Sequence, residues 1–487
     1  MAKRTAVIDI GSNSVRMVVF EKTSRFAFHL LHEAKSRVRI SEGAYEDNGN
    51  LQESAIQRAE LALRDFLSIA NSYHVRKILC VATSAVRDAP NQKLFVKRIN
   101  EKLKLNIKVI DGEKEAYLGG IACANLLPKM SAVTVDIGGG STEFAYIVDS
   151  KITQTLSLDL GTVRIKELFF DHDDVNGAIN YIDKALSNLP EQTCKQLIGV
   201  GGTFRALSRA LMKRADYPLH KTHGYQFKAK KLVDYGNAIL KADIDGLKAL
   251  DIKKERFDVI KPGTLILLRV INHLQSELLT TSGVGVREGV FLTDLLRHNR
   301  HYFPENYNPS MRYLLDHYTI EPRQINNIAQ VSKKLFDLLY ETWEIPAGYR
   351  EDLLIAAKLS KIGASLHFYS LHQHSYYLTQ TALEYGYSHE QIMLISTLVR
   401  FQKRKRPKKL HRQAYETLLP DEKTLTQLSF ILALSDALLS DHAQQIAFEL
   451  YFTKKTITVE SKKEELYLAK EAVEALEMPK GISVEFL

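Results

Sequence analysis

The chain has 487 residues, a length for which two to four domains are expected, and its 45% hydrophobic and 25% charged content is that of an ordinary soluble globular protein. No apolar run reaches the roughly 18 residues that a membrane-spanning helix needs, so no membrane association is expected. The formal charge of +9 and the pI of about 9.1 favour an acidic partner, such as nucleic acid, polyphosphate or an anionic membrane face, without choosing among them.

The amino terminus and the cysteines bear on the cellular compartment. The opening MAKRTAVIDIG enters a predicted strand at once, and we expect no secretion signal. Cys80, Cys123 and Cys194 lie far apart in apolar surroundings and match no metal-ligand pattern. They predict buried thiols in a reducing, cytoplasmic environment.

Residues 1–130 alternate between apolar strands and amphipathic helices. Strands are predicted at 5–20, 26–40, 77–83 and 106–111, and helices at 53–73, 92–103 and 114–124. This alternation predicts a layered α/β domain.

Residues 131–300 predict a second domain of the same class, with the active cleft between the two. Its strands are predicted at 132–137, 142–149, 151–158, 196–200 and 280–285. Its helices are predicted at 175–188, 203–212, 231–241, 264–278 and 287–297.

The rest of the chain changes character. HNRHYFPENYNPS, residues 298–310, is polar and contains proline, as linkers do. Residues 311–443 lack strand alternation and predict a helical bundle. Residues 444–487 predict a small α+β region, either separate from the bundle or continuous with it, with a hairpin at 445–460, a helix at 463–476 and a final strand.

One short pattern occurs twice. VIDIGSNSVRMVVF, residues 7–20, aligns without a gap to VTVDIGGGSTEFAYI, residues 133–147, so that Asp9 falls on Asp136. Each copy predicts a β-hairpin with a tip of small residues, where backbone N–H groups and hydroxyls can converge on an anion. An aspartate at such a tip can hold Mg²⁺, which prefers one or two carboxylates plus phosphate oxygens. Two facing tips would clamp a phosphate chain; the alternative is a pair of ordinary tight hairpins.

Six motifs in order resemble those of a known family. They are DIGSNSVR at 9–16, ATSAVRDAPN at 82–91, GEKEA at 112–116, DIGGGSTE at 136–143, GVGGTFRAL at 199–207 and SGVGVREG at 282–289. They resemble the exopolyphosphatase and guanosine pentaphosphate phosphohydrolase family, within the actin, Hsp70 and sugar-kinase superfamily. The resemblance implies an α/β fold with two duplicated actin-like (ribonuclease H-like) domains, then a helical HD-like domain and a small α+β region. It also implies release of terminal phosphate from inorganic polyphosphate, from pppGpp to give ppGpp, or from both, with Mg²⁺, and by analogy a homodimer.

The resemblance assigns the acidic residues. Glu115 matches the glutamate before alanine that the family uses to orient and activate water, and Glu113 and Glu143 are its competitors. Without the resemblance, Glu115 would be interpreted as an acidic residue in the first turn of a helix, where it stabilises the helix amino terminus. Asp9 and Asp136 are the expected Mg²⁺ ligands and water-positioning carboxylates, with Glu143 as a further candidate.

The phosphate-binding residues follow from the same motifs. The hairpin tips would supply backbone and side-chain donors from Ser12, Asn13, Ser14, Gly138, Gly139, Gly140, Ser141 and Thr142. Arg16 matches an arginine that the family keeps near the phosphates. Arg87 and Arg287 sit in matched motifs and could bind a polyanion bidentately, or could be surface or structural arginines.

The GVGGTFRAL loop corresponds to a nucleotide-binding position in related proteins. Gly201, Gly202 and Thr203 lie where ATP-using relatives hold their nucleotide, and here they would line the channel or contact a guanine nucleotide. Two alternatives to the hydrolase stay open: an ATP-dependent kinase of the same superfold, and a polyphosphate or alarmone sensor without turnover.

The helical region departs from a metal-binding HD domain. Ser360 and Lys361 stand where such a domain would have adjacent His and Asp, and a lysine repels the metal that an aspartate would hold. We therefore expect a degenerate HD-like domain without a second metal centre. The spacings of His367, His372 and His374 do not place them on one helix face, and structural or substrate-channel roles are expected.

The densest positive charge is RFQKRKRPKKLHR, residues 400–412. Its default interpretation is a solvated basic loop, and a nucleic-acid patch is not favoured. A basic track that tethers long polyphosphate between successive cleavages is the hypothesis we prefer.

Overall fold

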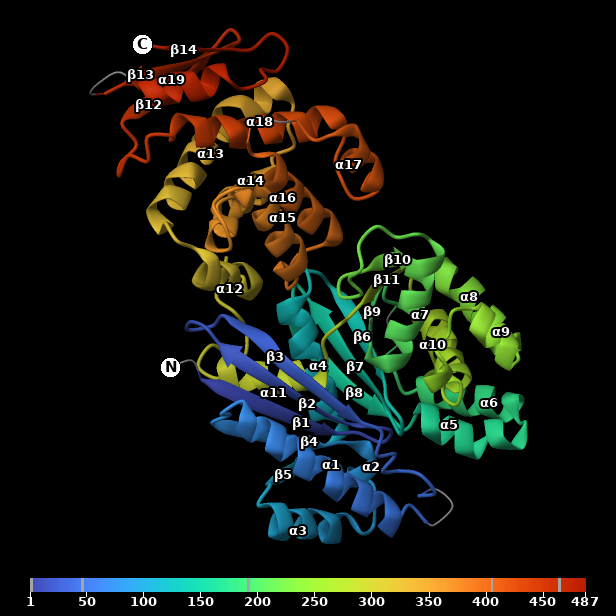
Figure 1. Cartoon of the computed structure of the whole chain (residues 1–487). Helices are drawn as coiled ribbons and strands as arrows, with labels where there is room; N and C mark the ends of the chain where they lie inside the picture. The colour runs from blue at the N-terminus through green and yellow to red at the C-terminus, as the bar shows by residue number, and fades with distance from the viewer. Residues whose placement is uncertain (1–2, 45–47, 191–192, 404–405, 463–465) are drawn as a thin grey trace. The chain divides into compact units, whose positions relative to one another are not determined.

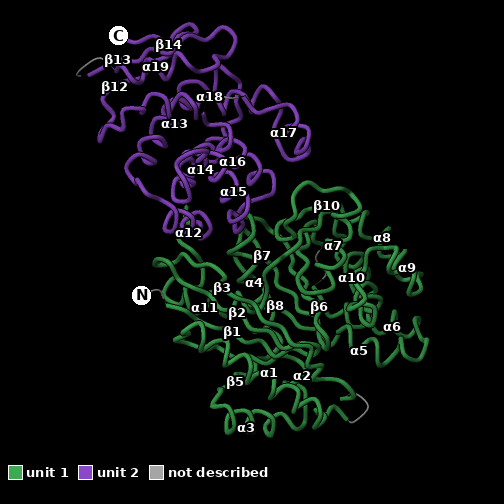
Figure 2. Tube along the Cα trace, in the orientation of Figure 1, with its two compact units in different colours: residues 1–307 green, residues 308–487 purple. Residues whose placement is uncertain are grey.

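The computed structural model describes residues 3–44, 48–190, 193–403, 406–462 and 466–487. The chain forms two compact units, Met1–Tyr307 and Asn308–Leu487, shown in green and purple in Figure 2. The boundary between them falls inside the segment 298–310 that the sequence predicts to be a linker.

The first sheet of unit 1 has five strands in the order β3-β2-β1-β4-β5 (Figure 1). The strands are β1 Arg4–Ile10, β2 Val15–Lys22, β3 Phe28–Ser36, β4 Lys77–Ala82 and β5 Ile107–Val109. The helices of this half are α1 Glu53–Ser72, α2 Ser84–Arg87, α3 Gln92–Leu103 and α4 Gly112–Leu126. The pairs β1–β2 and β2–β3 are antiparallel, whereas the pairs β1–β4 and β4–β5 are parallel, so the sheet is mixed. Its core packs Ile8 of β1 against Leu63 of α1, because the apolar stripe of the helix faces the sheet.

The second sheet has six strands in the order β10-β11-β9-β6-β7-β8. The strands are β6 Ala132–Ile137, β7 Thr142–Val148, β8 Lys151–Leu158, β9 Gln196–Val200, β10 Gln226–Lys228 and β11 Leu278–Thr281. The helices are α5 Thr162–Leu168, η1 Phe170–His172, α6 Val175–Leu186, α7 Gly201–Arg214, α8 Ala229–Lys241, α9 Ile244–Ala249, η2 Lys254–Arg256, α10 Ile260–Leu274 and α11 Val286–Leu295. The order β8-β7-β6-β9-β11 matches β3-β2-β1-β4-β5 strand for strand, and β10 is an added edge.

Two helices lie between the sheets and carry residues toward the site. α4 packs on β7 and β8 of the second sheet, while α11 packs on α4 and on β1 of the first sheet (Figure 1). The amino-terminal ends of both helices therefore meet near the hairpin tips.

The structure corrects two predicted segments of the second half. The helix expected at 264–278 is Ile260–Leu274, because Gln275 adopts a left-handed backbone (φ 51°) that ends α10. The strand expected at 280–285 is Leu278–Thr281, and the chain leaves the sheet at Ser282. A third expectation also fails in part: Cys80 and Cys123 are buried, but Cys194 is partly exposed.

Unit 2 is helical with a small sheet at its end. The helices are α12 Pro309–Tyr318, α13 Pro322–Trp343, α14 Tyr349–Leu359, η3 Ile362–Ser365, α15 Leu371–Ala382, α16 His389–Phe401, α17 Lys409–Ala414, α18 Glu422–Leu438 and α19 Tyr467–Glu474. β12 Phe448–Thr453, β13 Thr456–Ser461 and β14 Ser483–Phe486 form one sheet in that order. Leu339 of α13, Leu434 of α18 and Val459 of β13 belong to one buried core, so the small sheet is continuous with the bundle. In the described ranges, no helix of either unit is both long and apolar enough to cross a membrane.

Lys361, which the sequence analysis compared with the Asp of a metal-binding HD domain, forms an ion pair. The ammonium of Lys361 lies 2.6 Å from Oδ1 of Asp436 on α18, so a side-chain cation occupies this carboxylate. Ser360 is fully buried and its hydroxyl donates to the carbonyl of Ala357 at 2.8 Å. Of the basic run 400–412, Arg404 and Lys405 lie outside the described residues. Arg406 donates to the carbonyl of Met478 at 2.9 Å.

Candidate active site

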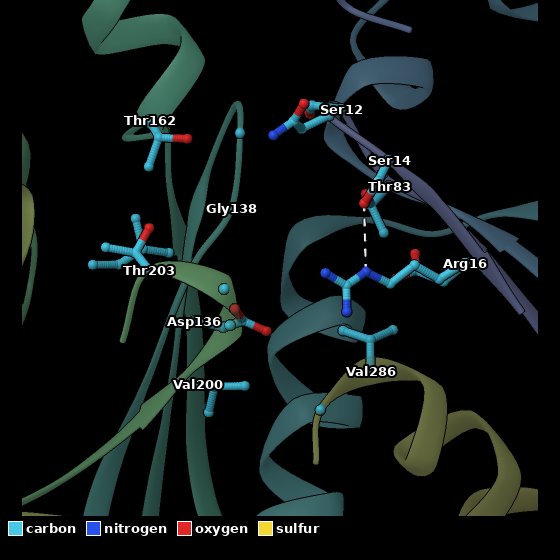
Figure 3. Close-up of a pocket in the computed structure, with 18 of the residues that line it drawn as sticks. Ser12, Ser14, Arg16, Thr83, Asp136, Gly138, Thr162, Val200, Thr203 and Val286 are labelled. Carbon is cyan, nitrogen blue, oxygen red and sulfur yellow. Dashed lines mark hydrogen bonds between the residues drawn. The ribbon is translucent and has the colours of Figure 1, made fainter. Parts of the chain in front are cut away.

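A cavity of about 170 Å³ in unit 1 opens between the ends of the two hairpins. Its wall is built from the tips of β1–β2 and β6–β7, the loop after β11, and the starts of α4, α7 and α11. The predicted residues on this wall are Asp9, Ser12, Asn13, Ser14, Arg16, Glu115, Asp136, Gly138, Gly139, Glu143, Gly201, Gly202, Thr203 and Arg287. Figure 3 shows two facing walls, with Asp136 and Thr203 on one and Arg16 and Ser12 on the other.

Three predicted phosphate donors do not line the cavity. Thr142 is fully buried, and its hydroxyl donates to the carbonyl of Leu160. Ser141 is 1% exposed, and the carbonyl of Gly140 accepts a 2.9 Å hydrogen bond from Nε of Arg164. Gly140, Ser141 and Thr142, at the β6–β7 hairpin, therefore contact the start of α5 and the segment that joins it to β8.

The two hairpin tips close in the same way. The amide of Gly11 donates to the carbonyl of Ser14 at 3.2 Å, and the amide of Gly138 donates to that of Ser141 at 2.9 Å. In the first hairpin Asp9 lies opposite Arg16, whereas in the second Asp136 lies opposite Glu143. The two hairpins therefore have the same backbone pairing, but the first places an acidic residue opposite a basic one and the second places two acidic residues opposite each other.

The two aspartates both line the cavity. Among the described residues, Oδ1 of Asp9 is buried without a hydrogen-bond partner. Burial raises the pKa of Asp9, against the charges of Arg287 and Arg16, and it raises the pKa of Asp136 to about 6, against Arg205. An unpartnered buried carboxylate oxygen is costly, and a cation would relieve that cost.

The backbone after β9 makes room for Asp136. Gly201 has φ +85°, and a Cβ at this position would lie 2.5 Å from Oδ1 of Asp136. Glycine is therefore required on two grounds, the left-handed backbone and the close approach.

Glu115 lies in the first turn of α4, whose start is capped by Asp111 through a 2.7 Å bond from the amide of Lys114. Nη1 of Arg87 donates to Oε2 of Glu115 at 3.1 Å. Burial raises the pKa of Glu115 well above its usual value, Glu143 adds to the rise, and Arg87 opposes it. The competitor Glu113 is exposed and is not on the cavity wall.

Glu143 is the most deeply buried of these acids. It is 3% exposed, and its Oε1 accepts a 3.0 Å hydrogen bond from the hydroxyl of Ser157. Burial raises its pKa to about 8, and the charge of Asp136 contributes to the rise. It lies close enough to Glu115 for each carboxylate to hinder ionisation of the other.

Basic groups crowd the same cavity. Nε of Arg16 donates to the hydroxyl of Ser14 at 3.4 Å, the dashed line in Figure 3. Arg287 is 8% exposed and its Nη1 donates to Oε1 of Glu33 at 2.7 Å. Burial and the nearby charges of Arg287 and Arg205 lower the pKa of Arg16 to about 10. Three guanidinium groups this close favour an anion between them.

The structure adds basic residues to the cavity wall that the sequence analysis did not single out: Lys35, Arg205 and Arg256. Arg205 lies three residues after Gly202 at the start of α7, a spacing that puts both on one helix face and could have predicted it. Lys35 lies directly opposite Arg16 in the β2–β3 register, which only the pairing reveals. No sequence pattern marks Arg256 in the short helix η2.

Comparison with known proteins identifies the family. Residues 18–298 match the model of the Ppx/GppA phosphatase family, and residues 308–479 match that of Ppx/GppA phosphatase, domain III. The chain belongs to the Ppx/GppA phosphatase family. Its family resemblance is thereby confirmed, and the two mixed sheets of unit 1 have the actin-like fold of Ppx/GppA proteins.

Solved structures of Ppx/GppA proteins are similar to this chain. The crystal structure of the Aquifex aeolicus family member is 26% identical, with a TM-score of 0.54, and the match covers 61% of this chain and 99% of that one. A second structure, of the Aquifex aeolicus PPX-GPPA enzyme, is 27% identical with a TM-score of 0.51, over 60% and 99% of the two chains. An exopolyphosphatase from Cytophaga hutchinsonii is 25% identical with a TM-score of 0.55, over 60% and 98%. Family membership thus assigns this chain to the phosphatases.

Proposed function

We propose that this chain is a phosphoanhydride hydrolase that releases the terminal phosphate of inorganic polyphosphate, the 5′ phosphate of pppGpp to give ppGpp, or both. The observation that carries the proposal is the largely buried carboxylate of Glu115, held by Arg87 in a cavity that also gathers arginines. A carboxylate whose pKa is raised toward the working pH is suited to accept a proton from water. Arginines beside it are suited to bind the phosphate that this water attacks.

The residues divide the work between binding and proton transfer. Arg16, Arg205 and Arg287 neutralise the phosphate oxygens, and the small residues at the hairpin tips let the phosphate approach the backbone. Glu115 orients the water in line with the terminal phosphorus and takes its proton. Arg87 fixes the rotamer of Glu115 through their 3.1 Å hydrogen bond.

The acidic residues fit a bound Mg²⁺. Asp9 and Asp136 are the ligands we propose, Glu143 is a further candidate, and the unpartnered Oδ1 of Asp9 marks where a cation is needed. Within the described ranges, no three of the cavity's carboxylate groups offer oxygens that all lie within 4.8 Å of one another. This arrangement suits Mg²⁺, which takes one or two carboxylates and completes its shell with water and phosphate oxygens. When bound, the ion would neutralise charge on the phosphate.

Other parts of the proposal concern architecture and cellular setting. The equal strand order of the two sheets, and the equal closure of their hairpin tips, support an internal duplication. We keep the HD-like relation of the helical domain, the homodimer and the cytoplasmic location as predictions from the sequence resemblance.

The test compares phosphate release from long-chain polyphosphate and from pppGpp, with Mg²⁺, by the wild type and by Glu115→Gln. The control is Glu113→Gln, which removes an exposed acid from the same helical turn. We expect Glu115→Gln to lose about 10²–10⁴-fold in kcat and Glu113→Gln to keep wild-type rates. Release from one substrate alone would fix the specificity. No release from either would overturn the hydrolase and favour a kinase, if ATP is consumed with an acceptor, or a sensor.

A further inference from the structure

A separate cavity of about 430 Å³ lies within unit 2 and has no part in the site of unit 1. Its wall comes from α18, from α19, and from the residues that follow α14, α16, α18 and α19. α18 packs against α14, α16 and α19, so the cavity lies along this one helix (Figure 1). A cavity of this size is in the range of those that bind small molecules.

An ion pair forms part of the wall. Nζ of Lys361 lies 2.6 Å from Oδ1 and 2.7 Å from Oδ2 of Asp436. Both side chains line the cavity, and they keep exposed fractions of 21% and 17%. An ammonium has three N–H donors and a carboxylate has about four acceptor positions, so the pair leaves a donor and acceptors unused. The wall therefore offers a positive and a negative group side by side.

Two further polar side chains of the wall have unused acceptors. Gln402 is 1% exposed, and its Nε2 donates to the carbonyl of Ser360 at 2.6 Å. In the part of the chain that the structure describes, Oε1 of Gln402 and Oγ of Ser440 are buried and have no hydrogen-bond partner. A buried acceptor without a donor costs free energy. Together with the carboxylate of Asp436, these atoms favour a ligand that brings N–H donors.

The rest of the wall is mostly aliphatic. Helical spacing places Ala433 and Ala437 on the same face of α18 as Asp436. Leu439, directly after α18, and Leu476, after α19, also line the cavity. Water could meet the needs of the polar atoms, but an apolar group gains free energy by covering these aliphatic side chains.

A nucleotide would fit this wall poorly. The residues that line the cavity include no Phe, Tyr or Trp on which a base could stack. The charge of Lys361 is matched by Asp436, and His442 pairs with Glu321 at 3.2 Å. The remaining cation of the wall is the exposed Lys403. One such lysine beside the ion pair suits a single carboxylate better than a chain of phosphates.

We propose that this cavity binds a free apolar α-amino acid. Its ammonium would donate to the carboxylate of Asp436 and to Oε1 of Gln402. Its carboxylate would accept from Lys361 and Lys403, and its side chain would cover the aliphatic part of the wall. The inference stands apart from hydrolysis in unit 1, because every residue that carries it belongs to unit 2.

The test measures binding to the full chain by isothermal titration calorimetry, with L-leucine, L-isoleucine, L-valine and L-methionine as probes. The tightest binder is compared with two analogues that each lack one charge, the des-amino acid and the decarboxylated amine. For L-leucine these are 4-methylpentanoate and 3-methylbutylamine.

Three variants locate the bound molecule. Ala472→Phe fills the cavity from α19, and its control Ala475→Phe adds the same ring at an exposed position just after that helix. Asp436→Asn removes the negative charge from the wall. Thermal unfolding confirms that each variant is folded.

We expect at least one of the four amino acids to bind with a dissociation constant at or below about 1 mM. Each analogue should bind about tenfold or more weakly, because it loses hydrogen bonds to a charged group. Ala472→Phe should abolish binding, and Ala475→Phe should keep it within about twofold. Asp436→Asn should weaken the amino acid about tenfold or more but not its des-amino analogue, whereas a merely structural role of Asp436 would weaken both equally.

The absence of binding by all four amino acids up to about 10 mM would overturn the proposal and indicate a cavity that holds only water. Equal affinities of the amino acid and its analogues would overturn it as well, as would binding that Ala472→Phe leaves unchanged. Binding of pppGpp that Ala472→Phe abolishes would assign the cavity to a nucleotide instead. If Ala472→Phe does not fold, the comparison of the amino acid with its des-amino analogue in Asp436→Asn decides.

Discussion

Nη1 of Arg87 donates to Oε2 of Glu115 at 3.1 Å while Nε of the same guanidinium donates to Asp88 at 3.0 Å. The arginine is therefore fixed by two acids and cannot swing freely into the cavity. This hydrogen bond joins the end of α2, where Arg87 lies, to the start of α4, where Glu115 lies, and the two residues are 28 positions apart in the chain. Because its charge opposes the effect of burial on Glu115, Arg87 tunes the group proposed to accept the proton.

Substitution of Arg87 should move the pH dependence of the reaction. Without this charge the pKa of Glu115 rises further, and the ionised form needed to accept a proton is lost at a higher pH. We expect the acidic limb of kcat/KM against pH to shift upward by on the order of one unit in Arg87→Met, and by less in Arg87→Lys. A uniform drop in kcat/KM with an unmoved acidic limb would contradict this role and indicate that Arg87 contacts the substrate alone.

Gly201→Ala should damage both folding and activity. The added Cβ would lie 2.5 Å from Oδ1 of Asp136, on a backbone with φ +85°. We expect the free energy of unfolding to fall by about 1–3 kcal/mol and phosphate release to fall with it. The matched control is Gly119→Ala in α4, where a Cβ would meet nothing within 4 Å and should stabilise the helix by up to about 1 kcal/mol. Urea unfolding of both variants checks the contrast, and equal effects would refute it.

Glu143 should make the protein less stable as pH rises. Its pKa is raised from 4.5 to about 8 by folding, so the folded state holds a proton that the unfolded state has released. The loss of folding free energy caused by ionising Glu143 is absent below pH 4.5 and grows between pH 4.5 and about pH 8. Above about pH 8 it levels off at roughly a few kcal/mol.

The change that tests this is Glu143→Gln, which keeps an oxygen for the hydroxyl of Ser157 but cannot ionise. We expect its unfolding free energy to exceed that of the wild type at pH 9 and to match it near pH 4.5. A residual slope is expected from Glu115, whose pKa is raised in the same direction. Parallel stability curves for the two proteins across this range would show that Glu143 is ionised at little cost.

Asp9→Asn should weaken the Mg²⁺ binding that we propose. An amide oxygen binds Mg²⁺ less well than a carboxylate, so half-maximal activity should need about tenfold or more Mg²⁺. The control Asp245→Asn removes a carboxylate that is 86% exposed and paired with Lys248, and its Mg²⁺ curve should match that of the wild type. Identical Mg²⁺ curves for Asp9→Asn and the wild type would remove Asp9 from the ligand set.

Local sequence patterns predicted most elements of this fold. The two hairpins, α1 and α3 follow from alternation and helical periodicity, because each buries one regular apolar face. The predicted end of α10 and the predicted bounds of the strand after it were wrong. The helix ends at Gln275, which has a left-handed backbone, and no glycine or proline marks this position in the sequence. Short elements such as α5 and β10 carry too few residues for a periodic pattern.

The sequence by itself determined the repeated hairpin, the acids at its two tips and the order of the motifs, because these are contiguous and depend on local chemistry. Tertiary structure alone decided that Lys35 faces Arg16, that Arg256 covers Gly202, and that Arg87 holds Glu115. It also removed Gly140, Ser141 and Thr142 from the cavity wall, since their neighbours in space are Arg164 and Leu160. The physical reason is that burial and charge coupling act between elements distant in the chain, and no local pattern records which of them will meet.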